Sequence, residues 1–286
     1  MTLLFLVYFI FFQIVPLFAF IYSFFQLFFY YVNIPYIWSK ICIKFAGCKV
    51  FLIDKSHELY MHPTKRCIYL PNHRDIYDFP IDTYITGGSG MFISRYLVMF
   101  AFPIQYIMSA IAKNTFYFKK NFIHDKIKFN KTIYESLVES NCRNLIIYPE
   151  GTRRNENTLI PIKKGATHIA WTYNMCVQII ITKNKEDILN LKTLTSKYGV
   201  NLYCYRSEVI NPEYFTSFEE FNSYVCLTWE NSWKKIYECK EADFIYRTLE
   251  VEPYNIKYSN LFFLFYNILP LIALLYWNFI YTNMQK

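Results

Sequence analysis

The sequence predicts an α/β domain with a mostly parallel sheet and flanking helices, joined to N- and C-terminal membrane helices. Both ends of the chain are long apolar segments without charge, and every charged residue except Lys286 lies between Lys40 and Lys257. Within this charged middle, short apolar runs alternate with stretches of helical periodicity, as in strand–helix–strand units. We therefore expect an N-terminal membrane segment over residues 1–39, one domain over 40–257 and a transmembrane helix over 258–286.

The N-terminal segment is apolar almost throughout from Thr2 to Tyr31, which exceeds the ~20 residues that a membrane-spanning helix needs. It lacks the basic start and the small-residue cleavage pattern of a signal peptide. Pro16 lies near its middle. The proline would either kink one long span or mark the turn of a hairpin that enters one leaflet.

Five short apolar runs of the middle region have the length of buried strands: Val50–Ile53, Cys67–Leu70, Thr115–Phe118, Leu145–Tyr148 and Val177–Thr182. Three intervening stretches have helical periodicity: Ile76–Tyr84, Asp125–Ser140 and Lys164–Tyr173. Strands that alternate with helices in this way predict a largely parallel sheet. We expect Lys183–Asn190 and Asn211–Glu220 to be surface loops or short helices.

The C-terminal segment, Leu261 to Tyr281, has the length of a single span. Basic residues gather on the middle-domain side of the two segments, at Lys40, Lys44, Lys49, Arg247 and Lys257. By the positive-inside rule, the middle domain faces the cytosol.

The charge and the cysteines exclude several classes of partner. The 30 basic and 22 acidic residues give a net charge of +8, which suits nucleic acid, anionic lipid headgroups or a phosphorylated substrate. No nucleic-acid-binding signature is present, and the apolar ends favour lipid, so we expect no nucleic-acid partner. The eight cysteines and five histidines show no metal-binding spacing. We therefore expect separate reduced thiols and no metal.

Two polar clusters come directly after predicted strands. Pro71-Asn72-His73 follows the run that ends at Leu70, and Pro149-Glu150-Gly151-Thr152-Arg153 follows the run that ends at Tyr148. Ligands of open α/β sheets bind at the carboxyl ends of the strands. Both clusters are thus predicted where chemistry is expected.

His73 and Asp78 are candidates for a catalytic pair. On one continuous helix they would point about 140° apart, so they meet only if His73 precedes the helix and Asp78 lies about one turn inside it. Asp75 is a candidate N-cap for this helix. An aspartate bonded to one imidazole nitrogen leaves the other nitrogen as a general base. Spacing alone explains a capping aspartate and a surface histidine equally well.

The order Asn72-His73, Asp78, then Glu150-Gly151-Thr152-Arg153 resembles the glycerolipid acyltransferase family of lysophosphatidate acyltransferases. The resemblance covers about residues 66–182. It implies that His73 deprotonates a glycerol hydroxyl, which attacks the thioester of acyl-CoA directly, while Asp78 orients His73. It also implies that residues 150–153 bind the phosphate of the acceptor. Arg153 offers a planar fork for phosphate oxygens, Gly151 allows close approach of the backbone and Thr152 adds a hydroxyl donor. Glu150 is expected to position Arg153 or a backbone amide.

Three residues depart from the family pattern. Asn114 stands where a glycine is expected, Lys120 where a phosphate-binding arginine is expected, and Gln178 where a proline is expected. Lysine keeps the positive charge but loses the bidentate fork. We expect Lys120 to bind substrate phosphate more loosely, and the identity of the acceptor is left open.

The resemblance predicts an acyl-CoA-dependent O-acyltransferase that converts lysophosphatidate to phosphatidate in phospholipid synthesis. The acceptor alternatives are another lysophospholipid or glycerol 3-phosphate. A different class of function is a non-catalytic membrane lipid-binding or scaffold protein. No cofactor is expected, since acyl-CoA is a co-substrate. We expect a membrane-integrated protein of the endoplasmic reticulum whose catalytic domain faces the cytosol.

Overall fold

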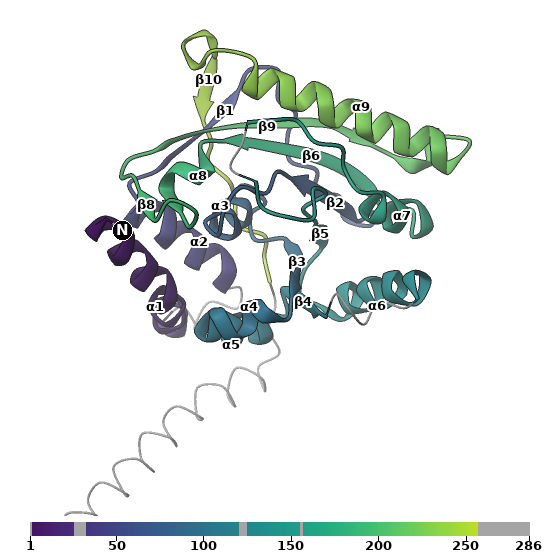
Figure 1. Cartoon of the computed structure of the whole chain (residues 1–286). Coiled ribbons are helices and arrows are strands. Elements are labelled where there is room, and N and C mark those ends of the chain that lie inside the picture. The colour runs from purple at the N-terminus through teal and green to yellow at the C-terminus, as the bar shows by residue number, and fades with distance from the viewer. Residues whose placement is uncertain (1, 26–32, 120–124, 155–156, 257–286) are drawn as a thin grey trace, which may run out of the picture.

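The computed structural model describes residues 2–25, 33–119, 125–154 and 157–256, and an eight-stranded sheet lies at its centre (Figure 1). The strand order is β10–β1–β9–β6–β2–β5–β3–β4. In this described part of the chain, five neighbouring pairs are parallel, and β1–β10 and β6–β9 are antiparallel. The strands are β1 Lys49–Ile53, β2 Cys67–Pro71, β3 Gly90–Arg95, β4 Thr115–Phe118, β5 Asn144–Ile146, β6 Cys176–Lys183, β9 Asn201–Ile210 and β10 Tyr246–Thr248. The predicted mostly parallel sheet is confirmed.

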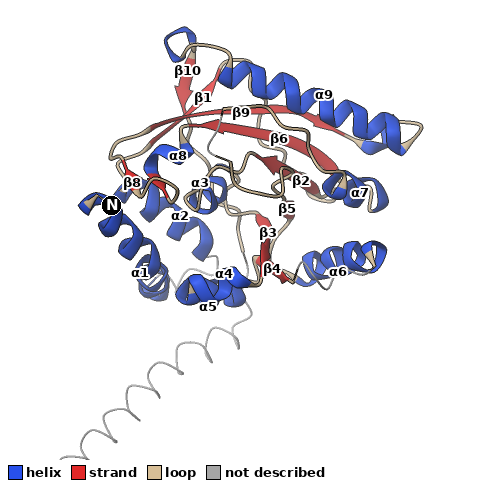
Figure 2. Ribbon diagram, in the orientation of Figure 1, coloured by secondary structure: helices blue, strands red, loops and turns tan. Residues whose placement is uncertain are grey.

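Helices cover both faces of this sheet (Figure 2). On one face lie α1 Leu3–Phe25, α2 Ile34–Phe45, α3 Asp78–Ile85, α4 Leu97–Ala101, α5 Pro103–Ala112 and α8 Lys185–Ile188. On the other face lie α6 Lys126–Glu139, α7 Gly165–Thr172 and α9 Phe218–Tyr237. Two short strands, β7 Leu189–Asn190 and β8 Thr195–Ser196, pair beside α8.

The central strands are apolar at nearly every position because both of their sides are buried. In β2, Cys67 and Tyr69 enter the core beneath α1, α2 and α3. Ile68 and Leu70 enter the core beneath α6, α7 and α9. A strand that is covered on both faces needs apolar side chains on both, so it appears in the sequence as a continuous run of apolar residues.

The predicted elements are present, with small shifts of their ends. The five predicted strands are β1, β2, β4, β5 and β6, and the three predicted helices are α3, α6 and α7. The prediction missed β3, β8, β9 and β10, and also α2, α4, α5 and α9. The two segments left as loops or short helices contain α8, β7, the 3₁₀ turn Pro212–Tyr214 and the start of α9. All eight cysteines are free thiols, as predicted.

The expected membrane helices are not supported. Among the described residues, none of the helices has the length and apolar character that crossing a membrane requires. The helix α1 continues through Pro16 and packs its buried side, Phe5, Tyr8, Phe12, Val15 and Ala19, against the core. The next helix, α2, extends across residue 39 within the same core. The C-terminal helix expected over 258–286 lies outside the described residues.

Candidate active site at the carboxyl ends of β2 and β5

The two polar clusters lie together because β2 and β5 are parallel neighbours, with Ile68 opposite Leu145. The loop after β2 carries His73, and the loop after β5 carries Glu150. The His73 amide donates a hydrogen bond of 2.5 Å to Glu150 Oε2. The Arg154 amide donates one of 3.0 Å to the His73 carbonyl oxygen. The structure therefore brings the two clusters into contact.

His73 contacts Asp78 through a hydrogen bond of 2.7 Å between Nδ1 and Oδ2. His73 precedes α3, as the helix geometry required, but Asp78 is the first residue of α3 rather than a residue one turn inside it. The amides of Arg74 and Asp75 also donate to Asp78 Oδ2. With three donors on one oxygen, the carboxylate is held in its ionised form. The bond at Nδ1 leaves His73 Nε2 as the nitrogen that accepts a proton.

Asp75 is not the N-cap of α3, which corrects the prediction. Tyr77 precedes the helix and makes no side-chain capping bond. The Asp75 carboxylate instead accepts the amides of Ile76 at 2.7 Å and Leu191 at 3.0 Å. It also forms an ion pair of 3.8 Å with Arg153. Asp75 therefore connects the β7–β8 turn and Arg153 to the loop between β2 and α3, which we call the catalytic loop.

The ring of Tyr148 stacks on the imidazole of His73, with centroids 4.0 Å apart and planes at 12°. Burial lowers the pKa of His73, although the hydrogen bond to Asp78 opposes this effect. His73 is therefore mostly neutral at pH 7, which is the form a general base requires. Sequence reasoning missed the role of Tyr148, which lies two residues before Glu150.

The Glu150 side chain accepts a hydrogen bond from the backbone amide of His73. Two roles were expected for Glu150, to position Arg153 or to position a backbone amide, and this contact is the second. Its side chain is buried, and burial raises its pKa to about 8. Within the described residues, its second oxygen, Oε1, has no hydrogen-bond partner. An ionised carboxylate in this position is costly, so Glu150 favours its protonated form in the folded state.

Replacing Glu150 with Gln is expected to stabilise the protein increasingly as pH rises. The pKa of Glu150 is higher in the folded chain, about 8, than its ordinary value of 4.5. Its contribution to stability is therefore full below pH 4.5 and is lost as pH rises toward 8. Between pH 5.5 and 8, urea unfolding should show the variant gaining up to about 3 kcal/mol relative to the wild type. A difference that stays constant with pH would contradict the raised pKa.

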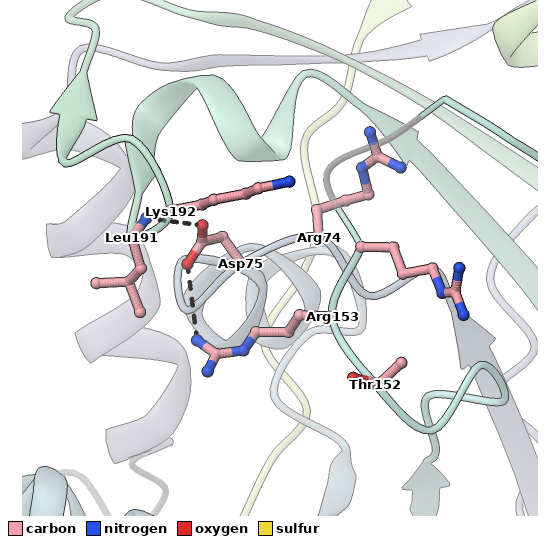
Figure 3. A pocket seen from close by; sticks show the side chains of 7 residues that line it. Arg74, Asp75, Thr152, Arg153, Leu191 and Lys192 are labelled. Carbon is pink, nitrogen blue, oxygen red and sulfur yellow. Dashed lines mark hydrogen bonds and ion pairs between the residues drawn. The ribbon is translucent and has the colours of Figure 1, made fainter.

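A basic pocket of about 490 Å³ opens beside the catalytic loop (Figure 3). Its lining consists of Arg74, Asp75, Thr152, Arg153, Arg154, Leu191 and Lys192. Figure 3 shows Asp75 between the guanidinium of Arg153 and the backbone of Leu191. Four of the lining side chains are cationic and one is a carboxylate, so the pocket favours an anionic ligand.

Of the second cluster, Thr152 and Arg153 line this pocket. The Arg153 side chain is 46% exposed, which leaves its fork accessible to a ligand. Gly151 has a φ of +72°, and a Cβ there would lie 2.3 Å from Lys163 Nζ. The positive φ therefore favours a glycine at this turn. Arg74 is buried and directed to Glu186 at 2.5 Å and Asn157 at 2.6 Å.

The three departures from the family pattern have different outcomes. Lys120 lies outside the described residues, so its phosphate role stays a prediction. Gln178 is buried, and its amide group donates to the carbonyl oxygens of Glu58 at 2.8 Å and Ser207 at 3.0 Å. Its side-chain oxygen accepts the amide of Tyr60 at 3.0 Å. Gln178 therefore connects β6 to its surroundings instead of binding substrate. Asn114 is buried directly before β4.

Comparisons with known proteins agree with this geometry. Residues 53–182 match the model of a family described as Acyltransferase, and this range includes both polar clusters. The structure also resembles that of the 1-acyl-sn-glycerophosphate (LPA) acyltransferase PlsC from Thermotoga maritima, with a TM-score of 0.63 and 17% sequence identity. The likeness covers 84% of this chain and 97% of that chain. At this identity it shows a shared fold.

Proposed function

Since the chain belongs to the glycerolipid acyltransferase family and is an acyltransferase enzyme, we propose that it transfers the acyl group of acyl-CoA to lysophosphatidate. The products are phosphatidate and free CoA. The observation that carries the proposal is the 2.7 Å hydrogen bond between His73 Nδ1 and Asp78 Oδ2. It prepares a general base beside a basic pocket, so the nucleophile is the hydroxyl of the acceptor.

In the proposed reaction, His73 Nε2 takes the proton of the acceptor hydroxyl as its oxygen attacks the thioester carbonyl carbon. The new C–O bond forms and the C–S bond breaks. The imidazolium then returns its proton to the CoA thiolate. Asp78 stabilises the imidazolium and fixes its orientation, as the aspartate of a Ser–His–Asp triad does. The reaction consumes acyl-CoA as a co-substrate and uses no other cofactor.

The basic pocket is proposed to bind the phosphate of the acceptor. Arg153 provides a planar fork for two phosphate oxygens, and Asp75 orients it through their ion pair. Thr152 adds a hydroxyl donor at the rim of the same pocket. Arg154 follows Arg153 and is bonded to the catalytic loop through its amide, so the pocket and His73 are held at a fixed spacing.

Replacing Arg153 with Ala is expected to raise the apparent KM for the phosphorylated acceptor about 30-fold, because a charge-assisted contact to phosphate is lost. The KM for acyl-CoA should stay unchanged. A matched control is Arg247→Ala, since Arg247 is also exposed and ion-paired, with Glu58 at 2.6 Å, but lies on the edge strand β10. A rise in the KM for acyl-CoA alone would reject the headgroup assignment.

We also propose that the protein works at a membrane surface. The outer side of α1 exposes a row of large apolar residues, Leu3, Val7, Ile10, Leu17 and Ile21, beside Leu97 and Phe100 of α4. Such a face suits burial at the boundary of headgroups and acyl chains. Flotation with phosphatidylcholine liposomes in high salt tests this, and protein left in the bottom fraction would contradict it. The endoplasmic reticulum, with the catalytic domain toward the cytosol, is the proposed location.

The acceptor is tested by assaying purified membranes with one acyl-CoA and a panel of labelled acceptors. The panel contains lysophosphatidate, other lysophospholipids and glycerol 3-phosphate. Fastest acylation of lysophosphatidate is expected, whereas preference for another member would reassign the acceptor within the same chemistry. No transfer to any member, with lipid binding retained, would favour a non-catalytic lipid-binding protein. The intact His73–Asp78 hydrogen bond argues against that alternative.

A further inference from the structure

A buried lysine lies directly behind the candidate catalytic pair. Asp78 and Asp82 are four residues apart on α3, so their side chains share one face of the helix. Lys185, from α8, reaches both carboxylates. Its Nζ lies 3.6 Å from Asp78 Oδ1 and 3.1 Å from Asp82 Oδ2. The three side chains are at most 1% exposed.

The ammonium group of Lys185 is fixed by further contacts. It donates a hydrogen bond of 2.6 Å to the carbonyl oxygen of Asn72, the residue before His73. Asp82, its other partner, accepts a hydrogen bond of 2.9 Å from the hydroxyl of Tyr148. The ring of Tyr148 in turn stacks on His73. Lys185 is therefore held within the shell of residues that surrounds the imidazole.

Asp78 depends on this lysine for compensation of its charge. Its Oδ2 accepts from the His73 ring and from two amides, whereas Oδ1 is buried and, within the described residues, has no hydrogen-bond partner. The ammonium of Lys185 is the cation that faces Oδ1. A buried carboxylate without a nearby cation takes up a proton more readily.

We propose that Lys185 is a positioning residue for acyl transfer, which keeps Asp78 ionised and His73 neutral and correctly oriented. The inference rests on the proposed function of the His73–Asp78 pair. If Lys185 were uncharged, the pair would keep an extra proton to higher pH, because the charge that opposes protonation is lost. A larger fraction of His73 would then already carry a proton at neutral pH and could not accept one from the acceptor.

Other charged or titratable groups also contribute to the electrostatic environment of His73, Asp78 and Lys185. Those from the neighbouring elements are Arg74, Tyr148, Glu150, Arg153, Cys204 and Tyr237. Burial raises the pKa of Asp82 to about 7. Asp82 is therefore largely protonated in the range below 6.5 in which His73 titrates. Of the two cationic side chains that oppose proton uptake by His73, Lys185 has the larger effect and Arg153 the smaller.

The experiment compares the wild type with Lys185→Met, Asp82→Asn and the double variant Lys185→Met/Asp82→Asn. The pKa of His73 is measured by NMR titration of the ¹⁵N-histidine-labelled protein in detergent, with the His73 signal assigned from His73→Ala. Removal of Lys185 should raise the pKa of His73 by about one unit. The acid limb of kcat/KM should move up equally, with KM for both substrates unchanged. Asp82→Asn should not raise the pKa.

The double variant separates positioning from folding. Lys185→Met alone leaves two buried carboxylates without a cation and risks misfolding. The double variant leaves only Asp78 ionisable among the three, so it should lose less stability in urea unfolding than Lys185→Met, yet still show the raised pKa of His73. A wild-type pKa in the folded double variant would overturn the proposal. The titration needs no substrate, so it tests the role of Lys185 even if none of the acceptors is acylated. A failure to acylate any acceptor would count against the proposed function and not against the role of Lys185.

Discussion

His73→Ala is expected to lower acyl transfer at least about 10³-fold, because the general base for the acceptor hydroxyl is removed. The residue lies in the loop between β2 and α3, outside the helices and strands of the fold. Folding and the proposed membrane binding should therefore be retained. The assay measures kcat with labelled acceptor and saturating acyl-CoA, and circular dichroism checks the fold.

The control for this variant is His57→Ala. His57 is exposed and lies in the loop after β1. In the sheet, β9, β6 and β2 lie between β1 and β5. The control should retain wild-type turnover. Turnover near the wild-type value in His73→Ala would reject the general-base role and would also remove the reason for assigning Asp78 to the reaction.

The central strands and the two polar clusters were predictable because their signals are local. β2 and β6 are buried on both faces, so their apolar runs stand out in the sequence. The loop that follows β2 and the loop that follows β5 each carry one motif. The sequence placed each cluster at the carboxyl end of a strand, and the pairing of β2 with β5 in the structure brings His73 and Glu150 into contact.

The strand β9 was not predicted because polar residues interrupt its apolar pattern at positions that are buried in the fold. Arg206 and Ser207 interrupt the apolar run, yet both are buried. The guanidinium of Arg206 donates a hydrogen bond of 2.7 Å to the carbonyl oxygen of Ile85, at the end of α3. Such a partner comes from a distant part of the chain, so the local sequence does not indicate that this arginine can be buried.

In contrast, α9 carried a signal that was available in the sequence. Ser217 caps the helix by accepting the amide of Glu220, and a serine followed three residues later by a glutamate is a capping sequence. Phe221, Val225 and Trp229 then recur at intervals of four residues and are buried. Lys185 had no comparable signal, because its partners come from α3 and from the loop after β2.

Asp78→Asn is expected to lower kcat about 10³- to 10⁴-fold with little change in the KM of either substrate, by analogy with the loss of the aspartate from a Ser–His–Asp triad. The asparagine oxygen can still accept the amides of Arg74 and Asp75, so the start of α3 should keep its shape. The amide is neutral, however, and cannot stabilise the imidazolium that forms when His73 takes the acceptor proton. It also places a neutral group where Asp78 faces Lys185.

The matched control is Asp243→Asn, which makes the same chemical change at an exposed position of a 3₁₀ turn before β10. Because the pKa of Asp78 is lowered in the folded protein, its ionised form stabilises the fold above its ordinary value of 3.8. The variant should thus be less stable than the wild type at pH 7, and this difference should shrink as pH falls below 3.8. Since the orientation of His73 is lost even in folded molecules, kcat must fall far more than the folded fraction. A kcat that declines only in proportion to the folded fraction would assign Asp78 to the stability of α3 and not to the reaction.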